Sequence, residues 1–173
     1  MSVESIVIAT DLNKTFKAEQ KGLDDVQALQ GINMQIKTGQ LTALVGPDGA
    51  GKTTFLRLIA GLYKPTAGSL EVLGMDVAKD PQSVQDRISY MPQKFGLYED
   101  LSIQENLDLY ADLHGVPMNV RKERFARLLK ITDLARFTER PAGKLSGGMK
   151  QKLGLACTLV RSPELLLLDE PSV

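Results

Sequence analysis

A glycine-rich segment at residues 46–53 constrains this 173-residue chain more than any other feature, because it reads Gly-Pro-Asp-Gly-Ala-Gly-Lys-Thr. It fits the pattern G-x-x-x-x-G-K-[ST], in which glycines let backbone N–H groups turn toward phosphate oxygens. A short apolar run at residues 41–45 precedes it, and Phe55, Leu58, Ile59 and Leu62 follow at helical spacing. The order predicts a strand covered on both faces, a phosphate-binding loop, and a helix whose N-terminus attracts anions.

The residues of this loop each have an expected part in holding a nucleotide. Lys52 supplies a full positive charge to the β- and γ-phosphates, and the Thr53 hydroxyl is a ligand suited to Mg²⁺. The full set of candidate nucleotide-binding residues in the segment is Gly46, Pro47, Asp48, Gly49, Ala50, Gly51, Lys52, Thr53 and Thr54. The alternative is a glycine-rich turn with a surface lysine. The pattern arises by chance in roughly one chain in 200 of this length at ordinary residue frequencies, so it predicts an NTPase without saying which kind.

A second acidic feature lies near the end of the chain, where four leucines at residues 165–168 lead into Asp169 and Glu170. Four apolar residues after Pro163 predict a buried parallel strand. Ligands bind at the carboxyl ends of such strands, where Asp169 can hold Mg²⁺ and Glu170 can polarise an attacking water. Ordinary surface acids at the end of a strand are the alternative.

The remaining pattern predicts strands in the first half of the chain and helices in much of the second. Residues 5–16, 69–73 and 88–91 have the composition of strands, and Ile32, Met34 and Ile36 alternate with polar residues. Ser102 and Glu105 form a capping-box pattern at the start of a helix. Further helices are expected from about residue 119 and from near Ser146. The sequence therefore predicts an α/β fold with an antiparallel sheet near the N-terminus.

Composition narrows the classes of function. The net charge is +0, which lacks the basic footprint of a nucleic-acid binder, and no apolar run approaches the roughly 20 residues of a membrane span. Cys157 is the single cysteine, so an internal disulfide is excluded; we expect it, and the single histidine His114, to have structural roles. The helix expected from residue 119 carries many basic residues, which predict a solvated face or, alternatively, contact with a membrane partner or lipid headgroups: Arg121, Lys122, Arg124, Arg127 and Lys130.

The order of four motifs resembles that of ATP-binding cassette (ABC) transporter ATPases over essentially the whole chain. These are the phosphate loop, Gln93, the segment Leu145-Ser146-Gly147-Gly148-Met149, and the leucine-rich strand followed by Asp-Glu-Pro. Two segments are similar to sequences of the bacterial multidrug exporter branch of that family: Tyr-Met-Pro-Gln at residues 90–93 and Met-Lys-Gln-Lys-Leu at residues 149–153.

This resemblance implies a P-loop NTPase core sheet with an antiparallel β subdomain and an α-helical subdomain, incomplete at the C-terminus. Residues 1–96 would hold the antiparallel sheet and phosphate-loop core, residues 97–154 the helical subdomain, and residues 155–173 the return to the core. The family has further strands and a histidine-bearing strand end, so we expect these 173 residues to be a fragment with little hydrolytic activity alone.

The resemblance also implies roles for single residues. Lys52, Gln93 and Glu170 would be catalytic, and Thr53, Gln93 and Asp169 would act at Mg²⁺. The signature residues Leu145, Ser146, Gly147, Gly148 and Met149 would close over ATP bound to a partner domain. Phe16 resembles the aromatic residue that stacks on adenine, although it can equally pack in the small sheet. Two substitutions depart from the family: Asp48, where Asn or Ser is more usual, and Met149, where Gln is more usual.

The expected ligands are ATP and Mg²⁺, and the expected partners are a second ABC ATPase domain and membrane-spanning permease subunits, without nucleic acid. The chain would then be cytoplasmic and peripheral on the inner face of the plasma membrane, powering drug or small-molecule export. One alternative is a soluble ABC protein of repair or translation, although only 52 residues (145 − 93) separate Gln93 from Ser146, too few for a long coiled-coil insert. A small-molecule kinase and a fragment that binds nucleotide without hydrolysing it are the others.

Overall fold

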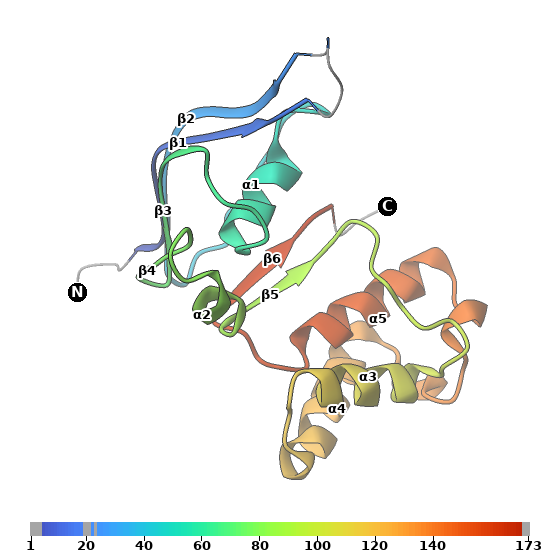
Figure 1. The fold of residues 1–173 in the computed structure, drawn as a ribbon. Helices are drawn as coiled ribbons and strands as arrows, with labels where there is room; N and C mark the ends of the chain where they lie inside the picture. Colours follow the sequence, from blue (N-terminus) through green and yellow to red (C-terminus); the bar gives the residue numbers. More distant parts are fainter. Residues whose placement is uncertain (1–4, 19–21, 23, 171–173) are drawn as a thin grey trace. The chain divides into compact units, whose positions relative to one another are not determined.

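The computed structural model describes residues 5–18, 22 and 24–170, which divide at Ile88 and Ser89 into two units of dense internal contact. Figure 1 shows the elements, which are best followed one unit at a time. The first unit contains strands β1 (Ser5–Phe16), β2 (Val26–Lys37), β3 (Ala67–Val72) and β4 (Met75–Asp76), with helices α1 (Lys52–Ile59) and α2 (Pro81–Gln85). Strand β5 (Ile88–Met91) begins at the division.

A four-stranded antiparallel sheet in the order β2-β1-β3-β4 forms the frame of the first unit. The predicted alternation of β2 is confirmed from Ile32 onward, since Ile32, Met34 and Ile36 are half-buried while the residue after each of them is exposed. The register of β1 shifts between Ala9 and Leu12, where Asp11 has a positive φ of 45°. Gly68 of β3 packs so closely on the Asp11 carbonyl that no Cβ would fit there.

The apolar side of helix α1 consists of Phe55, Leu58 and Ile59, which are all nearly inaccessible to solvent. The helix ends at Ile59, and Gly61, two residues further on, has a positive φ of +67°. Leu62 was expected on the same apolar face, and this is wrong: it lies beyond the helix end and is 52% exposed. A residue beyond the last helical turn leaves the 3.6-residue repeat, so spacing no longer places it inward.

The expected buried strand at residues 41–45 is also wrong. These residues form no strand, and Leu41 and Val45 are 100% and 95% exposed. A strand requires hydrogen-bonded neighbours, and the sheets among the described residues contain no strand paired with this segment. The apolar composition of the segment therefore does not by itself produce a strand.

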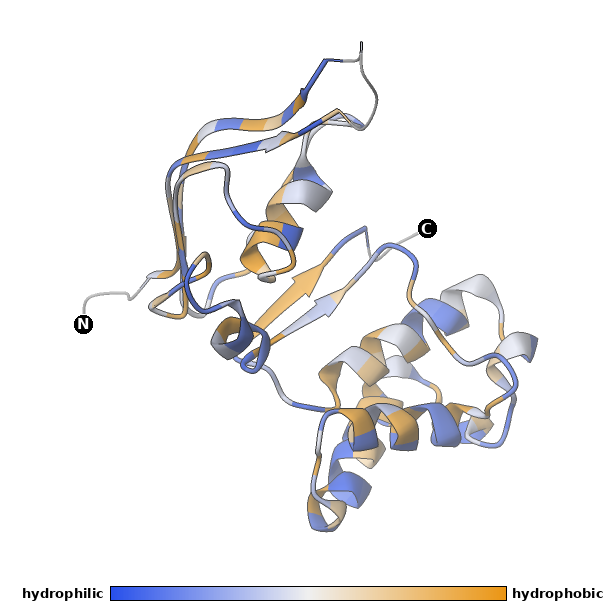
Figure 2. Ribbon diagram, viewed as in Figure 1, coloured by the Kyte–Doolittle hydropathy of each residue, from blue (hydrophilic) through white to orange (hydrophobic). Residues whose placement is uncertain are grey.

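The second unit contains a short sheet and a group of helices. Its elements are α3 (Ile103–Leu113), α4 (Met118–Thr132), the 3₁₀ turns η1 (Ala135–Phe137) and η2 (Ala142–Lys144), α5 (Gly147–Leu159) and β6 (Leu165–Leu168), which pairs with β5. The backbone N–H of Asp169, just past β6, donates to the carbonyl of Met91 at the end of β5 at 2.9 Å. Since both strand ends meet, β5 and β6 run in the same direction, as predicted for β6. Figure 2 colours β6 among the most hydrophobic parts of this unit.

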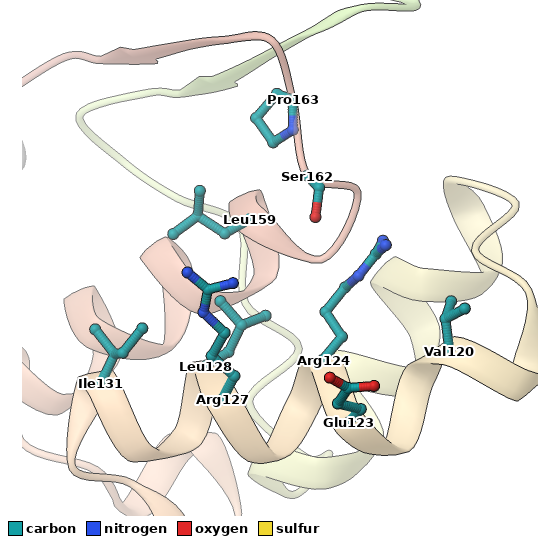
Figure 3. A pocket seen from close by; sticks show the side chains of 9 residues that line it. All are labelled: Val120, Glu123, Arg124, Arg127, Leu128, Ile131, Leu159, Ser162 and Pro163. Atoms are coloured by element: carbon teal, nitrogen blue, oxygen red, sulfur yellow. The ribbon is translucent and has the colours of Figure 1, made fainter. Parts of the chain in front are cut away.

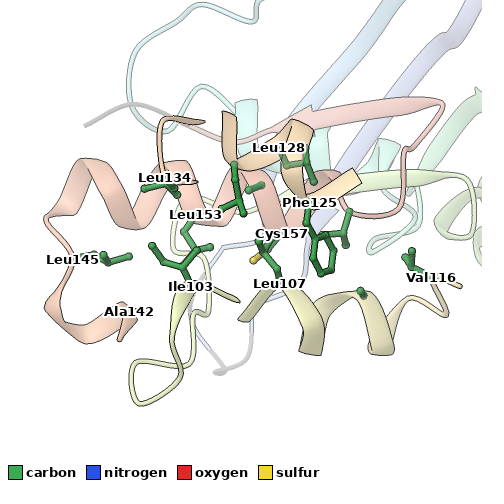
Figure 4. Packing of buried hydrophobic residues seen from close by; sticks show 14 residues of the cluster. Ile103, Leu107, Val116, Phe125, Leu128, Leu134, Ala142, Leu145, Leu153 and Cys157 are labelled. Atoms are coloured by element: carbon green, nitrogen blue, oxygen red, sulfur yellow. The ribbon is translucent and has the colours of Figure 1, made fainter. Parts of the chain in front are cut away.

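The three helices enclose a hydrophobic core of their own, drawn in Figure 4. Ile103, Leu107, Leu153 and Cys157 are fully buried in it, with Phe125 beside them at 5% exposure. The predicted capping box begins α3: the N–H of Glu105 donates to Ser102 Oγ at 3.2 Å, and the N–H of Ser102 donates to Glu105 Oε2 at 2.7 Å. These reciprocal bonds satisfy two N–H groups that the helix itself leaves unpaired. They also hold the pKa of Glu105 below its ordinary value.

Candidate functional site

The phosphate loop lies in the first unit, between the exposed segment at residues 41–45 and α1. Residues 46–50 are exposed, and the N–H of Ala50 donates to the carbonyl of Pro47 at 3.2 Å, which turns the chain. Gly49 and Gly51 have φ values of +77° and +85°. Both are in the left-handed region that favours glycine, so the two glycines allow the loop to fold back over the start of the helix.

Gly51 is required for a second reason. It is the N-cap of α1, and a Cβ at this position would lie 2.5 Å from the carbonyl oxygen of Ala28 and 2.8 Å from Leu29 Cδ2. By contrast, a Cβ on Gly49 would have nothing within 4 Å. The loop is therefore held against β2 at Gly51 and open to solvent at Gly49.

Lys52 lies across the loop that precedes it. Its ammonium group donates to the carbonyls of Gly46 and Pro47, both at 2.9 Å. These two bonds place a full positive charge beside the backbone N–H groups at the start of α1, where the helix dipole adds roughly half a charge of the same sign. The combination is of the kind that favours an anion, and nucleotide binding at the loop stays a prediction.

Four further predicted nucleotide residues belong to the same unit. Thr53 and Thr54 lie half-buried in the first turn of α1, and Asp48 is exposed in the loop. Phe16 ends β1, and its ring meets Tyr63 edge-on with centroids 5.4 Å apart. The Lys14 ammonium lies 5.0 Å from the Phe16 centroid. These contacts are those of a residue packed in the small sheet, and adenine stacking by Phe16 stays a prediction.

The second group of predicted residues lies at the carboxyl ends of β5 and β6. Gln93 follows β5, and its amide Nε2 donates to Glu170 Oε2 at 2.7 Å; both residues are exposed. Glu170 has a positive φ of 50°, a conformation that costs a non-glycine residue of order 1–3 kcal/mol and concentrates at functional sites. The structure thus brings together Gln93 and Glu170, which lie 77 positions apart in the sequence.

Asp169 differs from Glu170 in being buried, with an exposure of 2%. The hydroxyl of Tyr90, in β5, donates to Asp169 Oδ2 at 2.9 Å. Tyr90 was not predicted from the sequence as a site residue. The signal that could have found it is its place in a strand that ends beside the acidic strand end, with a hydroxyl able to reach a carboxylate.

The signature segment starts α5. Ser146 is the N-cap, and its Oγ accepts from the N–H of Met149 at 3.3 Å, while Leu145 is buried and the two glycines are exposed. Neither Gly147 nor Gly148 has a positive φ, and a Cβ on either would have nothing within 4 Å. Nothing within the described chain therefore requires glycine at these two positions.

The loop after Gln93 is tied to the signature region by three contacts. Lys150 Nζ pairs with Glu99 Oε1 at 2.6 Å, the N–H of Gly143 donates to the Glu99 carbonyl at 2.8 Å, and Ser102 bridges to Pro141. The ion pair is largely exposed and would be weak alone. The backbone bond and the bridge give it a fixed frame, so the chain near Glu99 and the start of α5 hold one another in place.

A separate pocket of roughly 450 Å³ lies between α4 and the end of α5 (Figure 3). It contains none of the predicted site residues; its lining is Val120, Glu123, Arg124, Arg127, Leu128, Ile131, Leu159, Ser162 and Pro163. Arg124 donates to the Val160 carbonyl at 2.6 Å, which satisfies the C-terminal end of α5 with a cation, as its dipole favours. Arg124 therefore has a structural role at this pocket.

The basic residues of α4 do not all lie on a solvated face, so that expectation is partly wrong. Arg121 is 9% exposed; it pairs with Asp112 at 2.7 Å and donates to the Val116 carbonyl at 2.9 Å. Lys122, Arg127 and Lys130 are exposed. The sequence could not separate them because a long basic side chain can turn back to cap a neighbouring segment.

Cys157 packs as predicted within the hydrophobic core, where burial raises the pKa of its thiol. Burial also raises the pKa of Tyr110 to about 12, and the Tyr110 hydroxyl donates to the Gly96 carbonyl at 2.7 Å. His114 ends α3 as its C-cap, and its pKa is lowered by partial burial and by the nearby Arg161. In the part of the chain that the structure describes, no helix is long and apolar enough to cross a membrane.

Comparison with known proteins adds evidence from outside the chain. A family model described as ABC transporter matches residues 29–173. The probable multidrug ABC transporter ATP-binding protein YbhF of Escherichia coli K12 is 54% identical over 170 residues, which is 98% of this chain and 28% of YbhF. The daunorubicin resistance ATP-binding protein DrrA3 of Streptomyces coeruleorubidus is 37% identical over 158 residues, which is 91% of this chain and 50% of DrrA3. The chain thus spans half or less of the length of these relatives.

A solved structure of an ATP-binding cassette is similar to this chain in fold. A dimeric ATP-binding cassette in a post-hydrolysis state, bound to ADP and Pi, matches with a TM-score of 0.82 and 28% identity. The match covers 96% of this chain and 74% of that one. The predicted α/β fold of the P-loop NTPase type is confirmed by this likeness.

Proposed function

Because this chain belongs to the ABC transporter family of ATP-binding domains, we propose that it is part of the ATP-binding and ATP-hydrolysing subunit of a bacterial exporter. The observation that carries the proposal is the phosphate loop. Two glycines with positive φ, the start of α1 and the Lys52 ammonium together make an anion-binding surface of N–H groups and positive charge. A triphosphate tail is the anion that such a loop suits best.

The residues present fit Mg²⁺ of the kind that accompanies a nucleotide. Mg²⁺ is usually held by one or two carboxylates together with phosphates and water, not by a cage of protein ligands. Accordingly, no group of three or more His, Cys, Asp or Glu side chains forms a metal cluster within residues 5–18, 22 and 24–170. In the second unit, the buried Asp169 carboxylate, which accepts a hydrogen bond from Tyr90, and the Gln93 side chain would contribute to holding the ion. In the first unit, the Thr53 hydroxyl is a further candidate ligand. When bound, Mg²⁺ neutralises charge that develops on the phosphates.

Glu170 and Gln93 would act on the attacking water. The Gln93 amide donates to one oxygen of the Glu170 carboxylate, which holds that carboxylate as an acceptor. A carboxylate held in this way can orient a water and take its proton, while Lys52 stabilises charge on the γ-phosphate. This division of roles makes Glu170 a residue of turnover rather than of binding.

The signature residues would serve a second ATPase domain. Among the residues that the structure describes, none gives Gly147 or Gly148 a conformational or steric reason to be glycine, so we infer that they admit something that approaches from outside. The backbone N–H groups at the start of α5 suit a phosphate held by another domain. The matching cassette is described as a dimer, in agreement with a partner of the same kind.

Coupling to membrane-spanning permease subunits would pass through residues 93–105, which the Glu99–Lys150 pair ties to the start of α5. The protein would then be peripheral on the inner face of the bacterial membrane. Export of drugs or other small molecules is favoured by the names of YbhF and DrrA3, which refer to multidrug transport and daunorubicin resistance. A soluble ABC ATPase without a permease, and a segment that binds nucleotide without hydrolysing it, are the alternatives.

The proposal is tested by titrating the full-length protein with a fluorescent ATP analogue and Mg²⁺. Lys52→Ala is expected to weaken binding strongly because it removes the charge beside the phosphates. Lys37→Ala, at an exposed residue at the end of β2, is the matched control and should bind as the wild type does. Unchanged affinity in the Lys52 variant would refute the phosphate-loop assignment.

Hydrolysis is tested separately. Glu170→Gln should keep ATP binding and lose most turnover, measured as phosphate release. Normal turnover in that variant would remove Glu170 from the reaction, and absence of turnover in the wild-type protein would favour the alternative that binds nucleotide only. If the protein releases no phosphate because no permease complex has been reconstituted with it, the result of the ATP-binding titration still stands. Binding and phosphate release are measured independently.

A further inference from the structure

The family resemblance assigns Tyr90 no role in binding or hydrolysis, yet Tyr90 contacts the buried acidic residue of the site. Its phenol hydroxyl donates to Asp169 Oδ2 at 2.9 Å, across the pair of strands formed by β5 and β6. Asp169 is 2% exposed and Tyr90 is half-buried. A hydrogen bond to a carboxylate in such surroundings is shielded from competition by water.

The backbone of Asp169 is held by Met91, which follows Tyr90 in β5. Its N–H donates to the carbonyl of Met91 at 2.9 Å, so two consecutive residues of β5 hold the backbone and the side chain of Asp169. Two torsion angles separate the Asp169 backbone from its carboxylate oxygens. With the backbone fixed, a bond to Oδ2 selects one orientation of the carboxylate plane.

The other carboxylate at these strand ends is held differently. Glu170 accepts from Gln93 at 2.7 Å, and both side chains are exposed, so water competes for that bond. The bond to Glu170 is therefore more open to solvent than the bond to the buried Asp169. A fixed carboxylate suits an ion that requires near-ideal octahedral geometry, which is the requirement of Mg²⁺.

We propose that Tyr90 is a positioning residue for Mg²⁺, acting through the orientation of the Asp169 carboxylate. The inference rests on the proposed function, in which Asp169 holds Mg²⁺ beside a bound nucleotide. Partners that orient a metal-binding side chain typically contribute 10–100-fold to metal affinity or activity. Tyr90 does not touch the nucleotide in this proposal, so its removal affects the use of Mg²⁺ and not the binding of ATP as such.

The test uses the full-length protein with Tyr90→Phe, which removes the hydroxyl and keeps the ring. Binding of a fluorescent ATP analogue is measured in EDTA and then over a range of Mg²⁺ concentrations. Mg²⁺ is expected to increase the affinity for the ATP analogue, and the Mg²⁺ concentration that gives half of this increase should be about 10-fold or more higher in the variant. The affinity for the analogue in EDTA should stay within about two-fold of wild type. Mn²⁺ binding to the nucleotide complex, followed by electron paramagnetic resonance, gives a readout of the metal itself.

Two controls separate positioning from a general effect on the fold. Tyr98→Phe changes the same chemical group at a residue that is 53% exposed, and it should leave both measurements unchanged. In an Asp169→Asn background, Tyr90→Phe should add no further effect on Mg²⁺ dependence if it acts through that carboxylate. An equal effect in the two backgrounds would show that Tyr90 acts elsewhere.

The outcomes are distinguishable from failure of the proposed function. An unchanged Mg²⁺ requirement in Tyr90→Phe, or an equal loss of affinity in EDTA, overturns the role of Tyr90. In either case, weakened binding by Lys52→Ala would still support the phosphate loop. Wild-type Mg²⁺ dependence in Asp169→Asn would instead refute the placement of Mg²⁺ at Asp169, and the role of Tyr90 with it.

Discussion

Replacing Gly51 by alanine tests whether the loop depends on close backbone contact as the structure indicates. The φ of Gly51 is +85°, and left-handed backbone costs an L-residue roughly 1–2 kcal/mol. The added Cβ would lie 2.5 Å from the Ala28 carbonyl oxygen, a backbone atom of β2 that cannot rotate away. Overpacking of this kind costs typically about 1–3 kcal/mol, which brings the total to about 2–5 kcal/mol.

This cost falls where the exposed loop at residues 46–50 joins α1, and the loop can open to relieve it but must close again to bind phosphate. Most of the strain should therefore appear as weaker ATP affinity. A penalty of at least about 2 kcal/mol corresponds to a Kd raised at least about 30-fold. Fluorescent ATP-analogue titration of the full-length protein measures this, and thermal unfolding records whatever part of the strain is retained in the folded loop.

Gly49→Ala is the matched comparison. Its φ is +77°, but its Cβ would meet no atom within 4 Å, so only the backbone cost of roughly 1–2 kcal/mol applies. Affinity should then fall about 5- to 30-fold, less than for Gly51→Ala. The reasoning is refuted if Gly51→Ala changes neither affinity nor Tm, and the close contact with Ala28 is refuted if both variants lose the same amount.

Leu153→Ala should lower the free energy of unfolding by about 2–5 kcal/mol in urea titrations, because Leu153 is fully buried, while Lys152→Ala should stay within about 0.5 kcal/mol of wild type; equal losses would contradict the core packing. His114 has a lowered pKa in the folded state, so the unfolded state binds more protons and stability falls as pH drops below about 6.5. His114→Gln should reduce the fall in urea midpoint between pH 7.5 and 5.5; an unchanged slope would speak against partial burial of the imidazole. Cys157 should react with a thiol reagent only on unfolding, because it is buried and its pKa is raised; rapid labelling of the native protein would rule this out.

Local features of the fold were predicted best. The capping box at Ser102 and Glu105 and the helix start near Ser146 both depend on residues within one helical turn. The bonds that define these features join neighbours in sequence, so residue type and spacing suffice to predict them. The alternation of β2 was predicted because successive side chains of a strand point to opposite faces of the sheet.

The apolar segment at residues 41–45 shows where such reasoning fails. Its composition favours a buried strand, yet Leu41 and Val45 are exposed because no described strand pairs with the segment. A strand depends on hydrogen bonds to another strand, and composition contains no information about which strands are present to pair. The prediction that Arg121 lies on a solvated face was wrong for a similar reason, since its burial depends on Asp112 of another helix.

The sequence by itself determined the phosphate loop, the helix starts and the presence of acidic residues after a leucine-rich strand, because each is a pattern of near neighbours. Only the tertiary structure decided that Tyr90 holds Asp169, 79 positions away, that Gln93 meets Glu170, and that Gly51 lies against Ala28. Contacts between distant residues depend on how strands pair and helices pack. That outcome is set by the free energy of the whole arrangement rather than by any short segment.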